Sequence, residues 1–471
     1  MKIGLVSGAY EARSLSANAQ RCVNLYPELN SQDAPFPVTY YPTPGLRLLA
    51  TAEQKGWRGL YVASNGALYG VCGNVLYRIS ALWELREIGT IDDLPTPVMM
   101  NDNGITMLLV DGSNKGYTVV LATEEFEQID DENFYGSDRV EMVDGFFVLN
   151  RPRSRQFYIS VPNSTTFDAL DFVAKSGYSD NLVTVAVVNR NIWLFGELTT
   201  EVFYNTGEAA FPFARYPGVF IQHGCAAKYS IASMDNSIYW LARNPQGRGI
   251  VMRSEGMQAL RISTHAIEDA IQNYPAIDDA IGFTYQQNGH MFYMLTFPRA
   301  NQTWCYDLST QLWHERAFLG EKGFERHRAV CHAKLLGINI VGDHSTGSLY
   351  ELDPDVYTDD STAIRRVRSF PHMADDANRV NYRKFIADME VGNGLDGSSN
   401  NPPVYLRWSD TRGRSWGNQV LGGLGSRGEY LTSIQYQRLG TARDRVFELS
   451  WSAPVRTALN GAYIEISGGS Q

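Results

Sequence analysis

Short runs of alternating apolar and polar residues, separated by tight-turn residues, fill the first three quarters of the chain. In one unit, apolar segments at 59–63, 67–71 and 75–79 are separated by Ser64-Asn65-Gly66 and Gly73-Asn74. Asn-Gly and Gly-Asn between alternating segments are typical of β-hairpins, because such turns need residues that tolerate positive φ. The pattern therefore predicts a series of short antiparallel strands.

This unit recurs at intervals of 37 to 53 residues along the chain. The seven positions that mark it are Leu60, Ile105, Met142, Ala186, Ser230, Phe283 and Val330. Units of three or four short strands predict a β-propeller of about seven blades, since each small twisted sheet buries its faces by stacking on its neighbours. Two β-sandwiches in tandem are the alternative. One helix is predicted, over residues 264–273.

The pattern changes near Pro354, where a polar, acidic stretch (355–361) precedes new alternating segments around Phe385, Leu406 and Leu449. These segments predict a β-sandwich. The fold class is thus all-β, with a propeller body over residues 1–354 and a sandwich tip over residues 355–471. We expect the strand 23–26 to close the last blade, so that residues 1–353 would fold without the tip.

Composition and charge narrow the function classes. The 471 residues are 44% hydrophobic, enough for a substantial core. The net charge of −10 argues against a DNA-coating role, which usually shows a basic surplus. Residues 1–363 carry a net charge of −14, whereas residues 364–471 have 14 Lys and Arg against 10 Asp and Glu. The chain has no run of 18 apolar residues, so the sequence predicts no membrane span. The apolar stretch at the N-terminus is too short for a secretory signal, so we expect synthesis in a cytoplasm.

Candidate catalytic chemistry is sparse. The chain has neither a GxxxxGK phosphate loop nor a GxSxG elbow, and its five cysteines form no CxxC pair. His327, Cys331 and His332 are the nearest approach to a metal cluster, but no fourth ligand accompanies them. We therefore expect no enzymatic activity, cofactor or metal.

The segment Trp408–Trp416 resembles the Asp-box, S-x-D-x-G-x-[TS]-W. Ser409, Gly413, Ser415 and Trp416 match this pattern, but Thr411 stands at the position of its aspartate. The resemblance implies a hairpin turn with a weakened side-chain lock. Asp-boxes are structural in the sialidases that carry them, so the motif does not indicate glycan hydrolysis.

Several other segments resemble one family of phage proteins. They are the run QRCVNLYPE at 20–28, YPTPGL at 41–46, NYRKF at 381–385, RLG at 438–440 and RDRVFE at 443–448. They are similar to the packaged DNA stabilisation proteins, or tail nozzles, of short-tailed phages (podoviruses). The resemblance spans nearly the whole chain.

That resemblance implies a non-enzymatic virion protein assembled in the host cytoplasm. It further implies a homohexameric propeller ring with a β-sandwich tip, docked below the portal and its adaptor ring. The ring would retain packaged double-stranded DNA, conduct it during ejection, and end in a tail needle or plug, or contact a tail fibre or spike. The family provides no catalytic residues to assign.

The basic tip supplies the candidate interaction residues. They are Arg365, Arg366, Arg368, Arg412, Arg414 and Trp416. We expect these residues to dock protein partners, and contact with DNA is the alternative for them. An acidic channel wall repels phosphate and lets DNA slide. The alternative function is a propeller-based phage tail protein that binds or cleaves glycans, which would need convergent carboxylates and stacked aromatic rings at the propeller axis.

Overall fold

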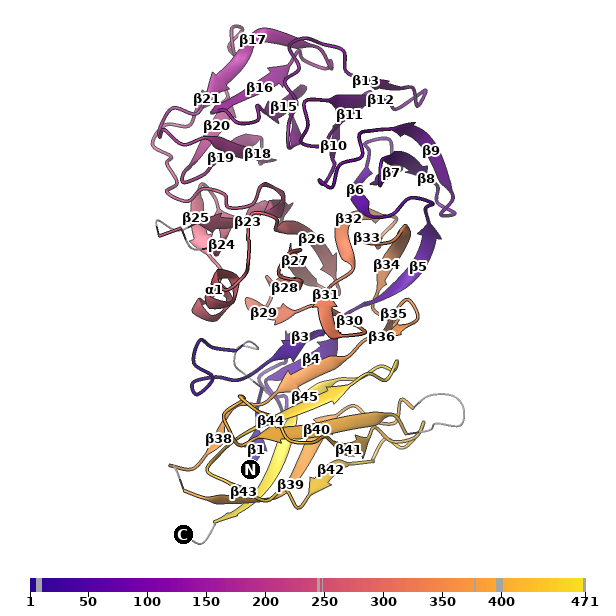
Figure 1. Ribbon diagram of the computed structural model, residues 1–471, viewed down its shortest axis with the longest axis vertical. Coiled ribbons are helices and arrows are strands. Elements are labelled where there is room, and N and C mark those ends of the chain that lie inside the picture. Colours follow the sequence, from indigo (N-terminus) through magenta and orange to yellow (C-terminus); the bar gives the residue numbers. More distant parts are fainter. Residues whose placement is uncertain (6–10, 244–245, 248, 377, 395–400, 469–471) are drawn as a thin grey trace.

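The turn-rich repeats fold as a ring of small radial sheets, and a second β-rich region lies at one end of that ring (Figure 1). The coordinates are a computed structural model that describes residues 1–5, 11–243, 246–247, 249–376, 378–394 and 401–468. We call the ring the propeller and the second region the tip.

Six blades of the propeller each consist of four consecutive antiparallel strands. Blades 1 to 6 are β6–β9 (57–90), β10–β13 (99–128), β14–β17 (140–174), β18–β21 (182–215), β22–β25 (232–261) and β26–β29 (281–315). Each blade packs on its neighbours through apolar clusters; Tyr69 and Leu109, for example, share a buried cluster between blades 1 and 2. The regular strand spacing of the sequence is thus the spacing of these sheets.

A further four-stranded unit completes the ring from two distant parts of the chain. Strands β32 (Ala329–Leu335), β33 (Ile338–Asp343) and β34 (Ser348–Asp353) are joined by β5 (Gly45–Thr51), which pairs antiparallel with β34. The sequence predicts about seven units, whereas the structure has six blades of consecutive strands. The difference is this composite sheet, which draws its strands from two parts of the chain. The prediction that residues 23–26 close the ring was wrong. Strand β5 closes it, because β5 directly precedes blade 1 in the chain.

The tip is a pair of packed sheets that includes the N-terminal strands. One sheet has the order β3 (Leu25–Leu29), β4 (Val38–Pro42), β45 (Leu459–Gly468), β39 (Val380–Met389) and β42 (Ile434–Gln437), with β1 (Lys2–Ile3) beside β45 and β43 (Thr441–Ala442) beside β39. The other has the order β2 (Cys22–Val23), β37 (Arg366–Ser369), β44 (Asp444–Trp451), β40 (Pro403–Ser409) and β41 (Val420–Gly423), with β38 (Met373–Ala374) beside β44. One apolar core lies between them and unites Leu25 and Tyr40 with Phe385 and Phe447.

Strands β1 to β4 therefore belong to the tip, whereas the sequence analysis assigned this part of the chain to the propeller body. Strand β2 also pairs in parallel with β29 (Leu312–Glu315) of blade 6, at Val23 and Glu315. A single ten-stranded sheet thus runs from blade 6 into the tip. A chain that ends at residue 353 would leave β2, β3 and β4 without their tip partners, so the expected boundary at residue 354 separates strands that pair in the tip.

The segment between propeller and tip adds to the edge of the composite sheet. Strand β35 (Thr358–Asp359) pairs in parallel with β5 and antiparallel with β36 (Thr362–Ala363). The backbone N–H of Gly45 donates to Val356 O at 2.9 Å. A β-carbon at Gly45 would lie 2.4 Å from the carbonyl oxygens of Val356 and Thr358, so only glycine permits this close approach.

The predicted helix is present as α1 (His265–Gln272). Thr264 caps its N-terminus by accepting a hydrogen bond from the Ile267 N–H, and Ile267 and Ile271 are buried. Before blade 5, Lys228–Ser230 forms a 3₁₀ turn, and the strand β22 (Ala232–Met234) begins after it. The Ser230 hydroxyl stabilises that turn by donating to Ala227 O at 2.7 Å.

Candidate functional site

Two of the predicted interaction residues, Arg366 and Arg368, are fully buried. Arg366 donates to the Ala453 and Tyr357 carbonyl oxygens at 3.1 and 3.3 Å. Arg368 donates to Gln20 Oε1 at 2.9 Å, and its guanidinium lies 4.8 Å from the ring centre of Tyr40. Their assignment as surface residues was wrong, because β37 lies between β2 and β44 inside the tip sheet.

The other four candidates lie at or near the surface. Arg365 is half-buried and lies over the Phe324 ring at 5.9 Å. Arg412 is exposed and pairs with Asp444 at 2.8 Å, and Arg414 is exposed. Trp416 is half-buried, with the guanidinium of Arg407 4.7 Å from its ring centre. Arg412 and Arg414 are thus the candidates that a partner could reach most directly.

The predicted turn within Trp408–Trp416 is confirmed. Ser409 Oγ accepts hydrogen bonds from the Gly413 and Thr411 N–H groups at 2.8 and 3.3 Å. Thr411 Oγ1 accepts from the Ser415 N–H at 2.8 Å, so a hydroxyl takes over the role that the motif gives to a carboxylate. Asp410 instead accepts two hydrogen bonds from the buried Arg445, at 2.6 and 2.8 Å. The motif is structural in this chain.

A buried polar joint connects the propeller to the tip. Arg21 makes a two-pronged ion pair with Glu315, both contacts 2.9 Å long. Nearby, Asp359 lies among arginines, and burial raises the pKa of its carboxyl to about 7. Burial also lowers the pKa of Arg366 to about 10. Asp359 Oδ1 and the Nε atoms of Arg316 and Arg366 have no hydrogen-bond partner among the described residues.

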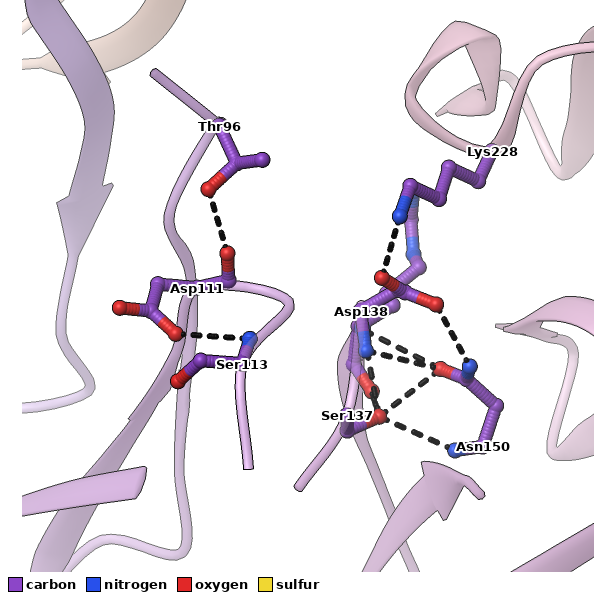
Figure 2. A network of polar contacts seen from close by, with 8 residues as sticks. Thr96, Asp111, Ser113, Ser137, Asp138, Asn150 and Lys228 are labelled. Carbon is purple, nitrogen blue, oxygen red and sulfur yellow. Dashed lines mark hydrogen bonds and ion pairs between the residues drawn. The ribbon is translucent and has the colours of Figure 1, made fainter. Parts of the chain in front are cut away.

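A second polar network lies where the connections of several blades meet (Figure 2). Asp138, which precedes blade 3, accepts hydrogen bonds from Lys228 Nζ at 2.5 Å and from Asn150 Nδ2 at 3.1 Å. Ser137 Oγ donates to Asn150 Oδ1 at 2.8 Å. Lys228 precedes blade 5, so the ion pair connects two blades that are not neighbours in the ring.

Arg58 extends this network toward blade 1. Its guanidinium donates to the carbonyl oxygens of Thr96, Gly73 and Asp92 at 2.7, 3.0 and 2.9 Å. Its Nη2 lies 4.0 Å from Asp111 Oδ2, and both atoms are buried without a hydrogen-bond partner among the described residues. Burial lowers the pKa of Arg58. The network thus holds charge of both signs inside the ring.

Two cavities meet at this part of the molecule. One, of about 240 Å³, is lined by the inner strands of blades 1, 2, 5 and 6 and by β32. A larger one, of about 540 Å³, shares Arg58, Pro97, Ile281 and Val330 with it. We call the larger cavity the axial pocket. Its size is that of a small-molecule site.

Within the described ranges, no three His, Cys, Asp or Glu side chains gather to hold a metal. His327 instead lies 3.1 Å from Arg316, and His332 lies 3.1 Å from Asn339. The described helix is too short and polar to cross a membrane. The five cysteines are unpaired thiols.

Comparison with protein-family models gives a match for both the propeller and the tip. Residues 1–357 match the family model described as bacteriophage P22 Gp10, β-propeller, and residues 365–467 match the one described as bacteriophage P22 Gp10, β-sandwich. The chain belongs to the bacteriophage P22 Gp10 family. Membership identifies it as a structural phage protein and a component of the virion tail. The resemblance found in the sequence is confirmed, as is the propeller with a C-terminal sandwich.

Other comparisons add less. The WD40 β-propeller domain of Doa1 is 11% identical, with 65% of this chain and 96% of that one aligned at a TM-score of 0.41. The N-terminal domain of Nup159 is 10% identical, with 70% and 98% aligned at a TM-score of 0.42. No curated protein matches the chain in sequence.

The sequence analysis predicted neither of the two polar networks. Asp138 and Lys228 are 90 residues apart, and Arg21 and Glu315 are 294 apart. No spacing motif connects such residues, because each pair meets only after the ring has closed. Arg366 and Arg368 lie in a strand with the sequence RVRS, which has one apolar residue, so its pattern gave no signal of a buried role.

Proposed function

We propose that this Gp10-family protein forms the tail nozzle: six copies in a ring below the portal and its adaptor. The ring retains packaged DNA and conducts it during ejection. It ends in a needle or plug, or contacts a tail fibre or spike. We propose further that the nozzle assembles in the host cytoplasm.

The observation that carries this proposal is the ten-stranded sheet shared by blade 6 and the tip. Backbone pairing at β2, the Arg21–Glu315 ion pair and the buried Asn24 make the connection, so the two regions form one elongated body (Figure 1). The wall of a channel that holds DNA must be rigid. Two regions joined only by a flexible linker would move relative to each other.

The proposed DNA path follows from the ring arrangement and from charge. In a ring of six copies, the duplex passes along the central channel between the copies and not through any one propeller. Residues 1–363 carry a net charge of −14, which repels phosphate and favours sliding over sticking. Retention therefore comes from mechanical closure of the channel. The exposed Arg412 and Arg414 are the proposed docking residues for a protein partner.

The proposal is tested with tails reconstituted from the portal, the adaptor and this protein. Mass photometry and electron microscopy should show six copies per tail, joined by one head-to-tail interface repeated around the axis. A stable monomer on the tail would contradict the proposal, whereas a monomer in free solution would not.

A functional test uses phage particles that lack the gene. Filled capsids made without the protein should lose their DNA, measured as nuclease-sensitive genome, and added purified protein should restore protection. Capsids that keep their DNA without the protein would exclude a retention role. Cleavage of a host glycan by the purified protein would support the alternative function instead.

A further inference from the structure

The axial pocket is lined by three cationic side chains and one carboxylate. Lys55 and Arg58 come from the start of blade 1, Arg326 from the end of β31 (Gly323–Arg326), and Asp93 from the connection between blades 1 and 2. His344, which follows β33, also lines it. The pocket therefore gathers positive charge inside a propeller whose overall charge is strongly negative.

Within the described part of the chain, these cations make no close ion pair with a carboxylate. No carboxylate of the described residues lies within 4.0 Å of Lys55 or Arg326, and the one near Arg58 is at that limit, 4.0 Å away. Arg326 donates to His344 Nδ1 at 3.0 Å, and burial together with Arg326 lowers the pKa of His344 to about 4, so this ring is neutral at pH 7. The lining then carries three positive charges and one negative charge. Outside the lining, Asp111 acts on Arg58, and Asp279 and Asp343 act on Arg326.

Burial makes this imbalance costly. The Arg58 side chain is 7% exposed, and its Nη2 has no hydrogen-bond partner in the described part of the chain. Burial outweighs the nearby carboxylates and lowers the pKa of both Arg58 and Arg326, so their charged forms are not fully compensated. An anion in the pocket would supply the missing charge and would accept hydrogen bonds from guanidinium and ammonium groups.

We propose that the axial pocket binds a small oxyanion of the phosphate type. Lys55 and Arg326 hold it directly, and Arg58 contributes its field from the buried side. A doubly charged tetrahedral oxyanion balances the net charge of the lining, and the pocket of about 540 Å³ admits it. This site is independent of the proposed nozzle function and would exist in a free monomer.

The test measures inorganic phosphate binding to the full chain by isothermal calorimetry and by thermal unfolding. Chloride replaces phosphate in the reference buffer at constant ionic strength, at pH 7.5. We expect saturable binding and a rise in Tm that follows it. Lys55→Gln and Arg326→Gln should each weaken phosphate binding at least tenfold.

A matched control is Lys334→Gln, which removes the same charge from an exposed position on β32 outside the pocket. It should bind phosphate like the unaltered protein. Lys55 is also exposed, so its variant tests the site even where Arg326→Gln fails to fold.

The proposal is overturned by no saturable phosphate binding, by equal weakening in the control variant, or by binding that both pocket variants retain. A duplex oligonucleotide is titrated in parallel. Binding of the duplex, but not of phosphate, that is lost in the pocket variants would make the pocket a DNA contact and would also refute the proposal.

Discussion

Asn24 is the side chain whose removal tests the propeller–tip connection most directly. It is buried, and its Nδ2 donates to Ala317 O at 2.8 Å and to Arg365 O at 3.0 Å. Its Oδ1 accepts from the Ala317 N–H at 2.9 Å. Asn24 thus bonds the segment after blade 6 and the start of the tip at once. Its φ is 56°, a left-handed value that asparagine tolerates better than alanine.

The cost of Asn24→Ala follows from these contacts. Three hydrogen bonds are lost, two of them buried and one partly buried, at about 1 kcal/mol each. The left-handed backbone adds about 1 kcal/mol for alanine. We expect the free energy of unfolding to fall by about 4 kcal/mol, and by about 3 kcal/mol in Asn24→Gly, because glycine removes the backbone cost.

Urea unfolding followed by tryptophan fluorescence measures these differences. Asn163 provides a matched control, since its φ is also 56° but it is exposed and its side chain makes no hydrogen bond among the described residues. Asn163→Ala should lose only the backbone contribution, about 1 kcal/mol. If Asn24→Ala loses no more than Asn163→Ala, the side-chain hydrogen bonds do not hold the joint, and the reasoning is refuted.

Three further predictions concern folding, DNA and pH. A fragment of residues 43–353 should unfold at a higher temperature and bind less hydrophobic dye than a fragment of residues 1–353. Only the longer fragment contains β3 and β4 without their partner β45, so only it exposes their apolar side chains. Equal behaviour of the two fragments would contradict the shared core. Anisotropy titration should detect no duplex DNA binding by the isolated protein near physiological salt. Micromolar affinity that falls with salt, by roughly 0.9 log units per log unit of salt for each phosphate contact, would contradict the sliding channel. Because the pKa of Asp359 is raised from 3.8 to about 7, the folded protein keeps a proton that the unfolded chain releases, so stability falls as pH rises through that window. Asp359→Asn should lack that fall in urea titrations between pH 4 and 8, and an unchanged slope would exclude Asp359 as its source.

Local signals were sufficient for the blades and the helix. Turn pairs such as Asn65-Gly66 and Gly73-Asn74 lie between β6, β7 and β8 as the sequence predicts, because these hairpins depend on backbone preferences of adjacent residues. The same holds for α1, whose cap, Thr264, is three and seven residues from the buried Ile267 and Ile271. The family resemblance likewise rested on short contiguous segments.

Long-range pairing escaped the same reasoning. Residues 23–26 have the apolar pattern of a blade strand, yet β3 pairs with β4 in the tip, and β5 closes the ring. The alternation of apolar and polar residues indicates that a segment is a half-buried strand. It does not indicate the partner strand, because many sheet edges can form the same backbone hydrogen bonds with it. Which edge it joins depends on how the whole chain closes.

The candidate residues show the same division. The sequence determined that the tip is rich in arginine, but arginines on an exposed edge and arginines within a central strand have the same composition. Only the tertiary structure placed Arg366 and Arg368 inside the sheet and left Arg412 and Arg414 exposed. It also brought Lys55, Arg58 and Arg326 around one cavity. Charge along a chain is set by the sequence, whereas the neutralisation of each charge depends on neighbours that only folding supplies.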